Sequence, residues 1–236
     1  MFDERINVLT YTVDRHRKTY DVLCLLKAYG YESVHIYAKD FSYTKTFVPL
    51  YEHRPPLPLV GKSSMQIAAN FHYPYHIINE YDDIQLPDES VFLVCGAGIL
   101  PDSFINRYIV INAHPGYIPI VRGLDSLKWA VCQYQPIGVT SHRISSGQVD
   151  AGEVIDRRKV ELKPNDSFHM VAYRQYEMEV CMLVEALDKI RDEHEWILAD
   201  GYPLHRRMPK SQEQDLLEKF EEYKRRYFSE SEKKFL

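Results

Sequence analysis

The segment IVINAHPGYIPIVRG, residues 109–123, changes character within a few positions. Its first three residues, Ile109 to Ile111, are β-branched and apolar and predict a buried strand. Asn112 and His114 follow two positions apart, and residues with this spacing project from the same face of a strand. Pro115 then restrains the preceding histidine to extended backbone geometry. The segment therefore predicts a strand whose end presents an amide and an imidazole to one point.

Two interpretations of this pair are open from these residues alone. An amide and an imidazole that converge can stabilise negative charge developing on an oxygen atom, and each such donor is worth roughly 3–4 kcal/mol of barrier. His114 can instead be a turn histidine that hydrogen-bonds to backbone groups. A second segment is needed to decide between them.

The composition narrows the class of protein. The 236 residues include 29 Lys and Arg against 34 Asp and Glu, and a net charge of −5 argues against nucleic acid as a partner. The four cysteines are widely scattered without a CxxC pair, so we expect reduced core residues. The first residues are acidic, unlike a signal peptide, and the longest apolar run, residues 91–100, is half of a membrane span. These features predict a soluble, cytoplasmic protein without a membrane partner.

Apolar runs that read as strands alternate along the chain with helical patterns. This alternation predicts an α/β protein with a Rossmann-like, mostly parallel sheet flanked by helices. Residues 153–162 alternate between apolar and polar side chains and predict a strand at an exposed edge. The expected strands are 5–11, 33–38, 74–78, 90–95, 108–112 and 137–144, and the expected helices are 14–30, 63–72, 100–105, 123–135 and a long one after Asp166 or Ser167. Ligands of such sheets bind beyond the carboxyl ends of the strands, which is where Asn112 and His114 fall.

The chain divides into a main domain, residues 1–200, and a C-terminal extension, residues 201–236. The extension starts as a loop over residues 201–211. An amphipathic helix with an apolar stripe follows. We expect this helix to pack on the domain or on a second subunit, so a homodimer is possible. The stripe consists of Leu216, Phe220, Tyr223 and Tyr227.

A second segment, GVTSHRISSGQVDAGEVI at residues 138–155, places Asp150 in a Ser- and Gly-rich loop after a buried strand. A carboxylate close to His114 would fix the tautomer of the imidazole and favour its protonated form, which can donate or relay a proton. Asp150 can also be an ordinary turn residue. His142 lies within the same segment, either as a support for the site or as a direct ligand contact.

INAHPGYIP…RG followed by GVTSHRI…VDAGEVI resembles the N10-formyltetrahydrofolate-dependent formyltransferases. This family includes glycinamide ribonucleotide, methionyl-tRNA and nucleotide-sugar formyltransferases. CGAGILP, residues 95–101, is similar to the family loop whose backbone cradles the pterin. The resemblance covers roughly residues 90–162. It implies catalytic roles for Asn112, His114 and Asp150, folate contacts at Ala97, Gly98, Ile99, Leu100 and Ile144, and substrate contacts at Tyr117 and Arg122.

The resemblance also implies a mechanism. The amine of the substrate attacks the formyl carbon of N10-formyltetrahydrofolate while Asn112 and protonated His114 hold the oxygen that becomes negative. Asp150 keeps His114 charged and oriented and takes part in proton transfer, with or without a water molecule. General acid–base help of this kind is worth about 10²–10⁴ in rate. No metal is expected.

The sequence departs from two branches of this family. The segment TYTVDRHRK has no glycine between Thr10 and Gly30, whereas the purine-biosynthesis branch has a Gly- and Ser-rich turn there that holds a substrate phosphate. Residues 202–236 carry charges of both signs and do not supply the basic domain of the methionyl-tRNA branch. A small sugar N-formyltransferase, acting on a nucleotide-linked amino sugar, is the remaining expectation.

Four other functions stay open. The protein could act on another small amine or hydrolyse 10-formyltetrahydrofolate, with water in place of the amine. It could be a metal-dependent hydrolase with His114, His142 and Asp150 as ligands. It could also be a binding module without catalytic activity.

Overall fold

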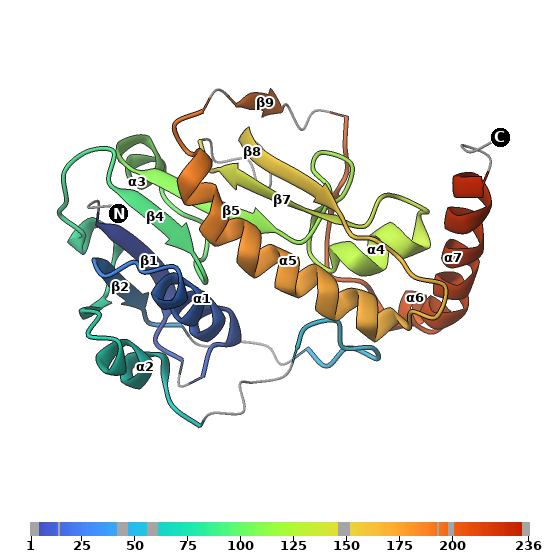
Figure 1. Cartoon of the computed structure of the whole chain (residues 1–236), viewed down its shortest axis with the longest axis horizontal. Coiled ribbons are helices and arrows are strands. Elements are labelled where there is room, and N and C mark those ends of the chain that lie inside the picture. Colours follow the sequence, from blue (N-terminus) through green and yellow to red (C-terminus); the bar gives the residue numbers. More distant parts are fainter. Residues whose placement is uncertain are drawn as a thin grey trace.

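The computed structural model describes residues 5–13, 15–41, 47–55, 61–145, 152–192, 194–197 and 201–232, with side chains as far as residue 229. Within these residues an eight-stranded sheet in the order β3-β2-β1-β4-β5-β7-β8-β9 forms the centre of the molecule (Figure 1). The strands are β1 Ile6–Tyr11, β2 Val34–Lys39, β3 Tyr75–Ile78, β4 Val91–Val94, β5 Ile109–His114, β7 Gly138–Arg143, β8 Gly152–Lys159 and β9 Glu195–Ile197.

The sheet has a parallel part and an antiparallel part. Strands β3, β2, β1, β4 and β5 run parallel to one another, whereas β7, β8 and β9 continue the sheet by antiparallel pairing. The predicted α/β class with a mostly parallel sheet is confirmed. The prediction of an edge strand at residues 153–162 is wrong, because β8 lies between β7 and β9. Alternating polarity shows that one face of a strand is solvated, and it does not show whether both edges are paired.

Helices cover both faces of the sheet. Helices α1 (Arg17–Ala28) and α5 (Phe168–Lys189) lie together in front of the sheet in Figure 1 and bury an apolar cluster that includes Leu26, Ile111 and Leu183. The side chain of Ser167 caps α5 by accepting a hydrogen bond from the backbone N–H of Met170, at 3.3 Å. The remaining helices are α2 Ser64–Asn70, α3 Asp102–Arg107, α4 Ser126–Cys132, α6 Lys210–Glu213 and α7 Leu216–Glu232, with a 3₁₀ turn at Tyr81–Asp83. None of the helices in the described part of the chain has both the length and the apolar character needed to cross a bilayer.

Two element boundaries near the strand ends differ from expectation. Strand β5 continues through His114, so Asn112 and His114 both belong to the strand. Helix α4 begins at Ser126 rather than at residue 123, because Gly123 and Asp125 have φ angles of 86° and 55° and a helix requires negative φ. These left-handed residues form a turn immediately before the helix.

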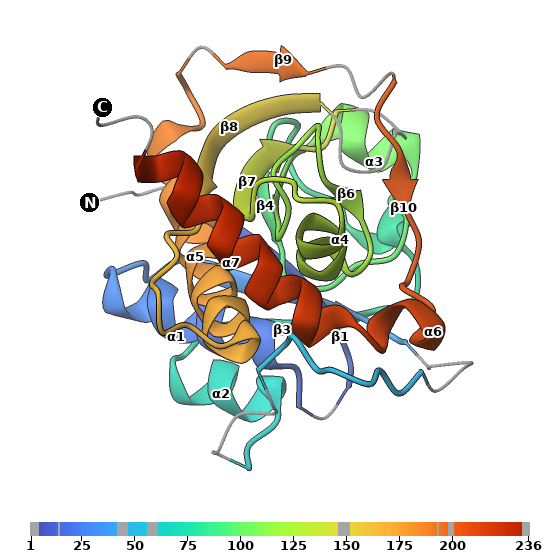
Figure 2. The same ribbon diagram turned by 90° about the vertical axis from the view of Figure 1, so that its right-hand side faces the viewer.

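The C-terminal segment packs along the domain. Residues 204–205 form a short strand, β10 (Leu204–His205), that pairs in parallel with β6 (Arg122–Gly123), as Figure 2 shows beside α4. This strand was predicted as loop, because two residues are too few to show a periodicity. The predicted apolar stripe of α7 is confirmed: Leu216, Phe220 and Tyr223 are buried in one cluster with residues of α4 and α5.

Two neighbouring leucines at the start of α7 test this packing. Leu216 is fully buried, whereas Leu217 is 39% exposed. We expect Leu216→Ala to lower the free energy of unfolding by about 2–5 kcal/mol, because it removes buried methyl groups and leaves a cavity. Leu217→Ala is the matched control, and we expect a change of at most about 0.5 kcal/mol. Urea unfolding measures both, and equal losses would contradict the packing of α7.

Candidate active site

A cavity of about 580 Å³ opens at the carboxyl ends of the parallel strands, within the range usual for small-molecule sites. Val94, the last residue of β4, and the residues that follow it as far as Leu100 form part of its wall. Asn112 and His114 reach it from the end of β5, and His142 and Ile144 reach it from β7 and the residues after it. A cavity thus lies at the strand ends where the sequence places the site, and the assignment of this cavity as the site stays a prediction.

Asn112 is held by a cross-strand contact. The register of β5 and β7 places Asn112 opposite His142, and the Asn112 Nδ2 atom lies 3.3 Å from His142 Nε2. His142 is buried, with an exposed fraction of 2%. If Asn112 donates one of its two amide hydrogens to His142, the second hydrogen is available to a ligand. His142 therefore lines the cavity and is also placed to orient the amide.

His114 is buried and has a defined partner at one ring nitrogen. Its Nε2 atom lies 3.1 Å from Ser126 Oγ, at the first residue of α4. Gly116 leaves the room that the ring needs: a Cβ atom at this position would lie 2.5 Å from His114 Nε2 and 2.5 Å from the backbone oxygen of Val121. The glycine of the HPG segment is thus required for the position of the imidazole.

The residues proposed from the resemblance as folate contacts all line the cavity. Ala97, Gly98, Ile99, Leu100 and Ile144 lie around one part of it. The side chain of Ile99 is 85% exposed, and no heavy atom lies within 4 Å of the position that a Cβ atom would take at Gly98. An exposed apolar side chain beside open space suits a flat aromatic ligand.

Three other predicted residues are placed differently. Asp150 lies outside the described residues. Tyr117 packs against the charged groups of Arg157 and Lys159. Arg122 is buried, and its Nη1 atom donates to the carbonyl oxygen of Tyr202 at 3.3 Å. Among the described residues that line the cavity, neither Tyr117 nor Arg122 occurs, and their role in substrate binding stays a prediction.

A charged cluster at the cavity wall was not predicted from the sequence. Glu179 of α5 is almost fully buried and forms ion pairs with Lys18 Nζ, at 2.9 Å, and with the guanidinium group of Arg54. Burial opposes ionisation of Glu179, but the positive charges of Arg54 and Lys18 outweigh it and hold the pKa of this carboxyl at about 2. The signal was present in the sequence, because Gln175 and Glu179 fall within the apolar stripe of α5 at helical spacing.

Two other titratable groups near the cluster stay neutral. Burial and the charge of Lys18 lower the pKa of His16 to about 4. Burial raises the pKa of the Cys95 thiol, at the cavity wall, to about 12. Near pH 7, therefore, His16 is uncharged, and Cys95 is a thiol rather than a nucleophilic thiolate. The charge in this part of the site comes from Lys18, Arg54 and Glu179.

Comparison with known proteins identifies the family. A profile described as formyl transferase matches residues 52–187, which include Asn112, His114 and Asp150. The chain belongs to this family. The formyl transferase resemblance seen in the sequence is thereby confirmed.

Individual relatives match shorter parts of this formyl transferase. The dTDP-4-amino-4,6-dideoxyglucose formyltransferase of Mycobacterium bovis is 33% identical over 92 residues, which are 39% of each chain. A methionyl-tRNA formyltransferase of Lachnospira eligens is 30% identical over 113 residues, which are 45% of this chain and 35% of the relative. Each match thus spans less than half of the relative's length.

A solved structure shows the same fold over most of the chain. The N-formyltransferase from Helicobacter canadensis, in complex with folinic acid and dTDP-3-aminofucose, superposes with a TM-score of 0.57 at 13% identity. The superposition covers 87% of this chain and 72% of that structure. At this identity the likeness concerns the fold.

The buried cluster makes a testable contribution to stability. Glu179→Gln removes the carboxylate and leaves Lys18 and Arg54 without their shared partner. We expect the free energy of unfolding to fall by about 3–5 kcal/mol at pH 7. Glu177→Gln, two positions earlier on the same helix and exposed, is the control and should change little.

The same pair of variants tests the pKa of Glu179. Its folded-state pKa of about 2 lies below the ordinary value of 4.5, so its stabilisation is present above about pH 4.5 and is lost as pH falls towards 2. Urea unfolding between pH 3 and 6 should show a shallower loss of stability in Glu179→Gln than in Glu177→Gln. Parallel curves would mean that Glu179 has an ordinary pKa.

Proposed function

We propose that the protein transfers a formyl group from N10-formyltetrahydrofolate to the amine of a nucleotide-linked amino sugar. The observation that carries the proposal is the position of Asn112 and His114 on one face of β5, at a cavity of about 580 Å³, in a member of the formyl transferase family. The similarity to an enzyme named for a dTDP-amino sugar supports this acceptor class.

The chain offers a surface that fits the folate. Bound N10-formyltetrahydrofolate supplies an activated formyl group. We place its ring beside the exposed side chain of Ile99, with Leu100 and Ile144, where apolar groups and backbone polar groups of residues 95–100 lie together. The open space at Gly98 leaves room for close approach to the backbone.

Asn112 and His114 act on the oxygen of the formyl group. The amide of Asn112, oriented by His142, donates one hydrogen bond to this oxygen, and the imidazole of His114 donates a second. Donors that are already oriented stabilise the charge developing on the oxygen without reorganisation, and losing one costs roughly 3–4 kcal/mol of barrier. We assign to Asp150 the orientation of His114 and the transfer of a proton, directly or through water, from the attacking amine to N10 of the folate, as the bond between the formyl carbon and N10 breaks.

The charged cluster at the cavity wall suits the phosphates of the acceptor. Two cations, Lys18 and Arg54, share one carboxylate, Glu179, so the cluster carries a net positive charge beside the cavity. A positive site within a low-dielectric wall attracts an anionic ligand. This cluster takes the place of the Gly- and Ser-rich phosphate turn that the segment after β1 lacks.

The predicted cytoplasmic location and homodimer stay predictions.

Mass spectrometry of reaction products tests the proposal. The protein is incubated with N10-formyltetrahydrofolate and a panel of nucleotide-linked amino sugars, with glycinamide ribonucleotide and methionyl-tRNA as comparison acceptors. We expect one amino sugar to gain the mass of one CO unit. Steady release of formate without any acceptor would instead identify the folate hydrolase, and formylation of only a comparison acceptor would overturn the sugar assignment.

The roles of the three site residues give a separate prediction. We expect Asn112→Ala, His114→Ala and Asp150→Ala each to reduce turnover at least about 10²-fold, with the fold retained. His169→Ala, an exposed histidine on α5, is the control and should keep the wild-type rate. Initial rates with a saturating acceptor measure the effect, and circular dichroism checks the fold. Near-normal rates for His114→Ala and Asp150→Ala would refute the assignment.

A further inference from the structure

Ser126 contacts His114 from the first position of α4. It is buried, with an exposed fraction of 3%, and its Oγ atom has two partners. It donates a hydrogen bond to the carbonyl oxygen of Gly123 at 2.8 Å, and it lies 3.1 Å from His114 Nε2. The same hydroxyl therefore connects the imidazole to the turn before α4.

The single hydrogen of this hydroxyl determines which of its partners donates and which accepts. A serine hydroxyl has one hydrogen, and a carbonyl oxygen can only accept. When the hydrogen is directed to Gly123, the oxygen can only accept from His114, so Nε2 must carry a hydrogen. The nitrogen that gains and loses a proton is then Nδ1. Ser126 thus selects one tautomer of the neutral imidazole and holds the plane of the ring.

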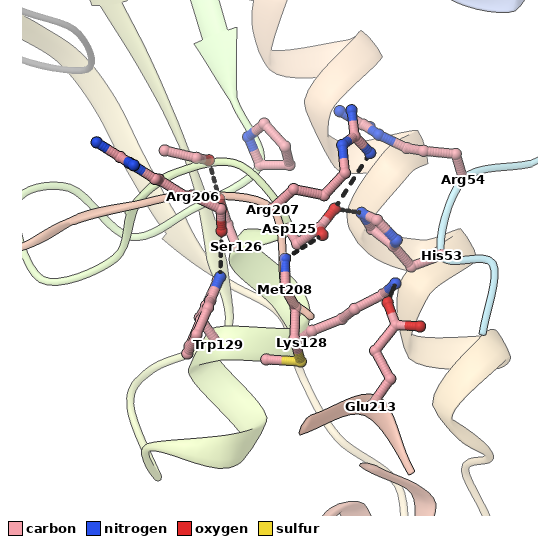
Figure 3. A network of polar contacts seen from close by, with 12 residues as sticks. His53, Arg54, Asp125, Ser126, Lys128, Trp129, Arg206, Arg207, Met208 and Glu213 are labelled. Atoms are coloured by element: carbon pink, nitrogen blue, oxygen red, sulfur yellow. Dashed lines mark hydrogen bonds and ion pairs between the residues drawn. The ribbon is translucent and has the colours of Figure 1, made fainter. Parts of the chain in front are cut away.

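The turn that carries Ser126 is held by residues 204–208. Gly123 has a φ of 86°, and a Cβ atom there would collide with the backbone of His205, whose carbonyl oxygen accepts from Leu124 N at 2.9 Å. Asp125 also has a left-handed backbone, and its buried carboxylate accepts from the N–H of Met208 at 2.8 Å (Figure 3). Left-handed geometry at a residue other than glycine is costly unless surrounding contacts impose it.

Further contacts fix the same segment to α4. The Trp129 indole donates to the carbonyl oxygen of Arg206 at 2.8 Å (Figure 3). The indole also stacks on the His205 ring, with centroids 4.7 Å apart. Lys128 and Glu213 form an ion pair in which both side chains are fully buried. Residues 204–213 therefore contact the turn and the first residues of α4 that follow Ser126.

We propose that Ser126 is a positioning residue for His114, and that residues 204–213 act on the reaction by holding Ser126 in place. This inference rests on the proposed function, because it concerns how His114 is prepared for that reaction. The C-terminal segment lies far from His114 in the sequence but is connected to it by a chain of contacts. Met208 contacts Asp125, the turn at Gly123 contacts Ser126, and Ser126 contacts His114.

Ser126→Ala tests the contact, with Ser141→Ala as a matched control. Ser141 is a buried serine on the neighbouring strand β7, and within the described residues its hydroxyl has no hydrogen-bond partner. We expect Ser126→Ala to lower kcat by about 10-fold to 100-fold with KM values close to wild type, because the imidazole is misplaced while binding is retained. Ser141→Ala should leave both constants unchanged.

Nitrogen NMR of histidine-labelled protein supplies a readout that needs no turnover. Spectra are recorded across a pH series, so that the neutral form of His114 is observed. Its signals, assigned by their loss in His114→Ala, should report the Nε2–H tautomer of that form in the wild type and in Ser141→Ala, and a mixture of tautomers in Ser126→Ala. Identical His114 signals and kcat in all three proteins would overturn the proposal. A wild type without formyl transfer would overturn the proposed function, and the NMR spectra would still decide the contact between Ser126 and His114.

Two variants of Asp125 test its contact with the backbone of Met208. Asp125→Asn keeps an oxygen that can accept from Met208 N, and asparagine tolerates left-handed backbone, whereas Asp125→Ala removes the acceptor. We expect Asp125→Ala to change kcat and the His114 signals in the same direction as Ser126→Ala, and Asp125→Asn to resemble the wild type. Wild-type behaviour of both variants would show that the C-terminal segment does not act on His114.

Discussion

The register between β5 and β7 is the constraint on which the site depends. It sets Asn112 opposite His142 and His114 opposite Thr140. The Thr140 hydroxyl donates to the carbonyl oxygen of Gly116 at 2.8 Å and accepts from the N–H of Ile118 at 3.1 Å, so it holds the turn after His114. A slip of one residue would turn the side chains of Asn112 and His114 to the opposite face of the sheet. The antiparallel pairing thus places the amide and the imidazole and also supports each of them.

Segments far apart in the sequence complete the surroundings of this pair. Helix α5 supplies the buried carboxylate of Glu179, which allows two cations, Lys18 and Arg54, to stand close together at the cavity wall. The C-terminal segment holds the turn before α4, whose Ser126 contacts His114. The cavity therefore combines a wall of hydrogen-bond donors, an apolar wall and a positive wall, each built by different elements. Such a division suits the reaction proposed above, between a folate and an anionic acceptor.

Much of the fold was predictable because its signals are local. The apolar runs of β1, β4 and β5 and the long stripe of α5 each have a period that identifies the element. The spacing of Asn112 and His114 identified their common face in the same way. The edge position predicted for residues 153–162 was wrong, because strand partners depend on the rest of the chain. Asp150, Tyr117 and Arg122 stay predictions from the family resemblance.

The missed features all depend on contacts between distant residues. Glu179 was not recognised as a site residue, because its role depends on ion pairs with Lys18 and Arg54, which are more than 120 positions away. The strand β10 is too short to show a period, and it exists because Gly123 offers a close approach to His205. The contact between Ser126 and His114 likewise follows from the left-handed turn at Asp125, and the local sequence does not predict this turn.

The most direct test of the account is a crystal structure with a stable N10-formyl folate analogue bound. We expect the formyl oxygen to lie within roughly 2.6–3.2 Å of both Asn112 Nδ2 and a ring nitrogen of His114, with the folate ring beside Ile99 and Ile144. A formyl group directed away from this pair, or a folate bound outside the cavity, would contradict it.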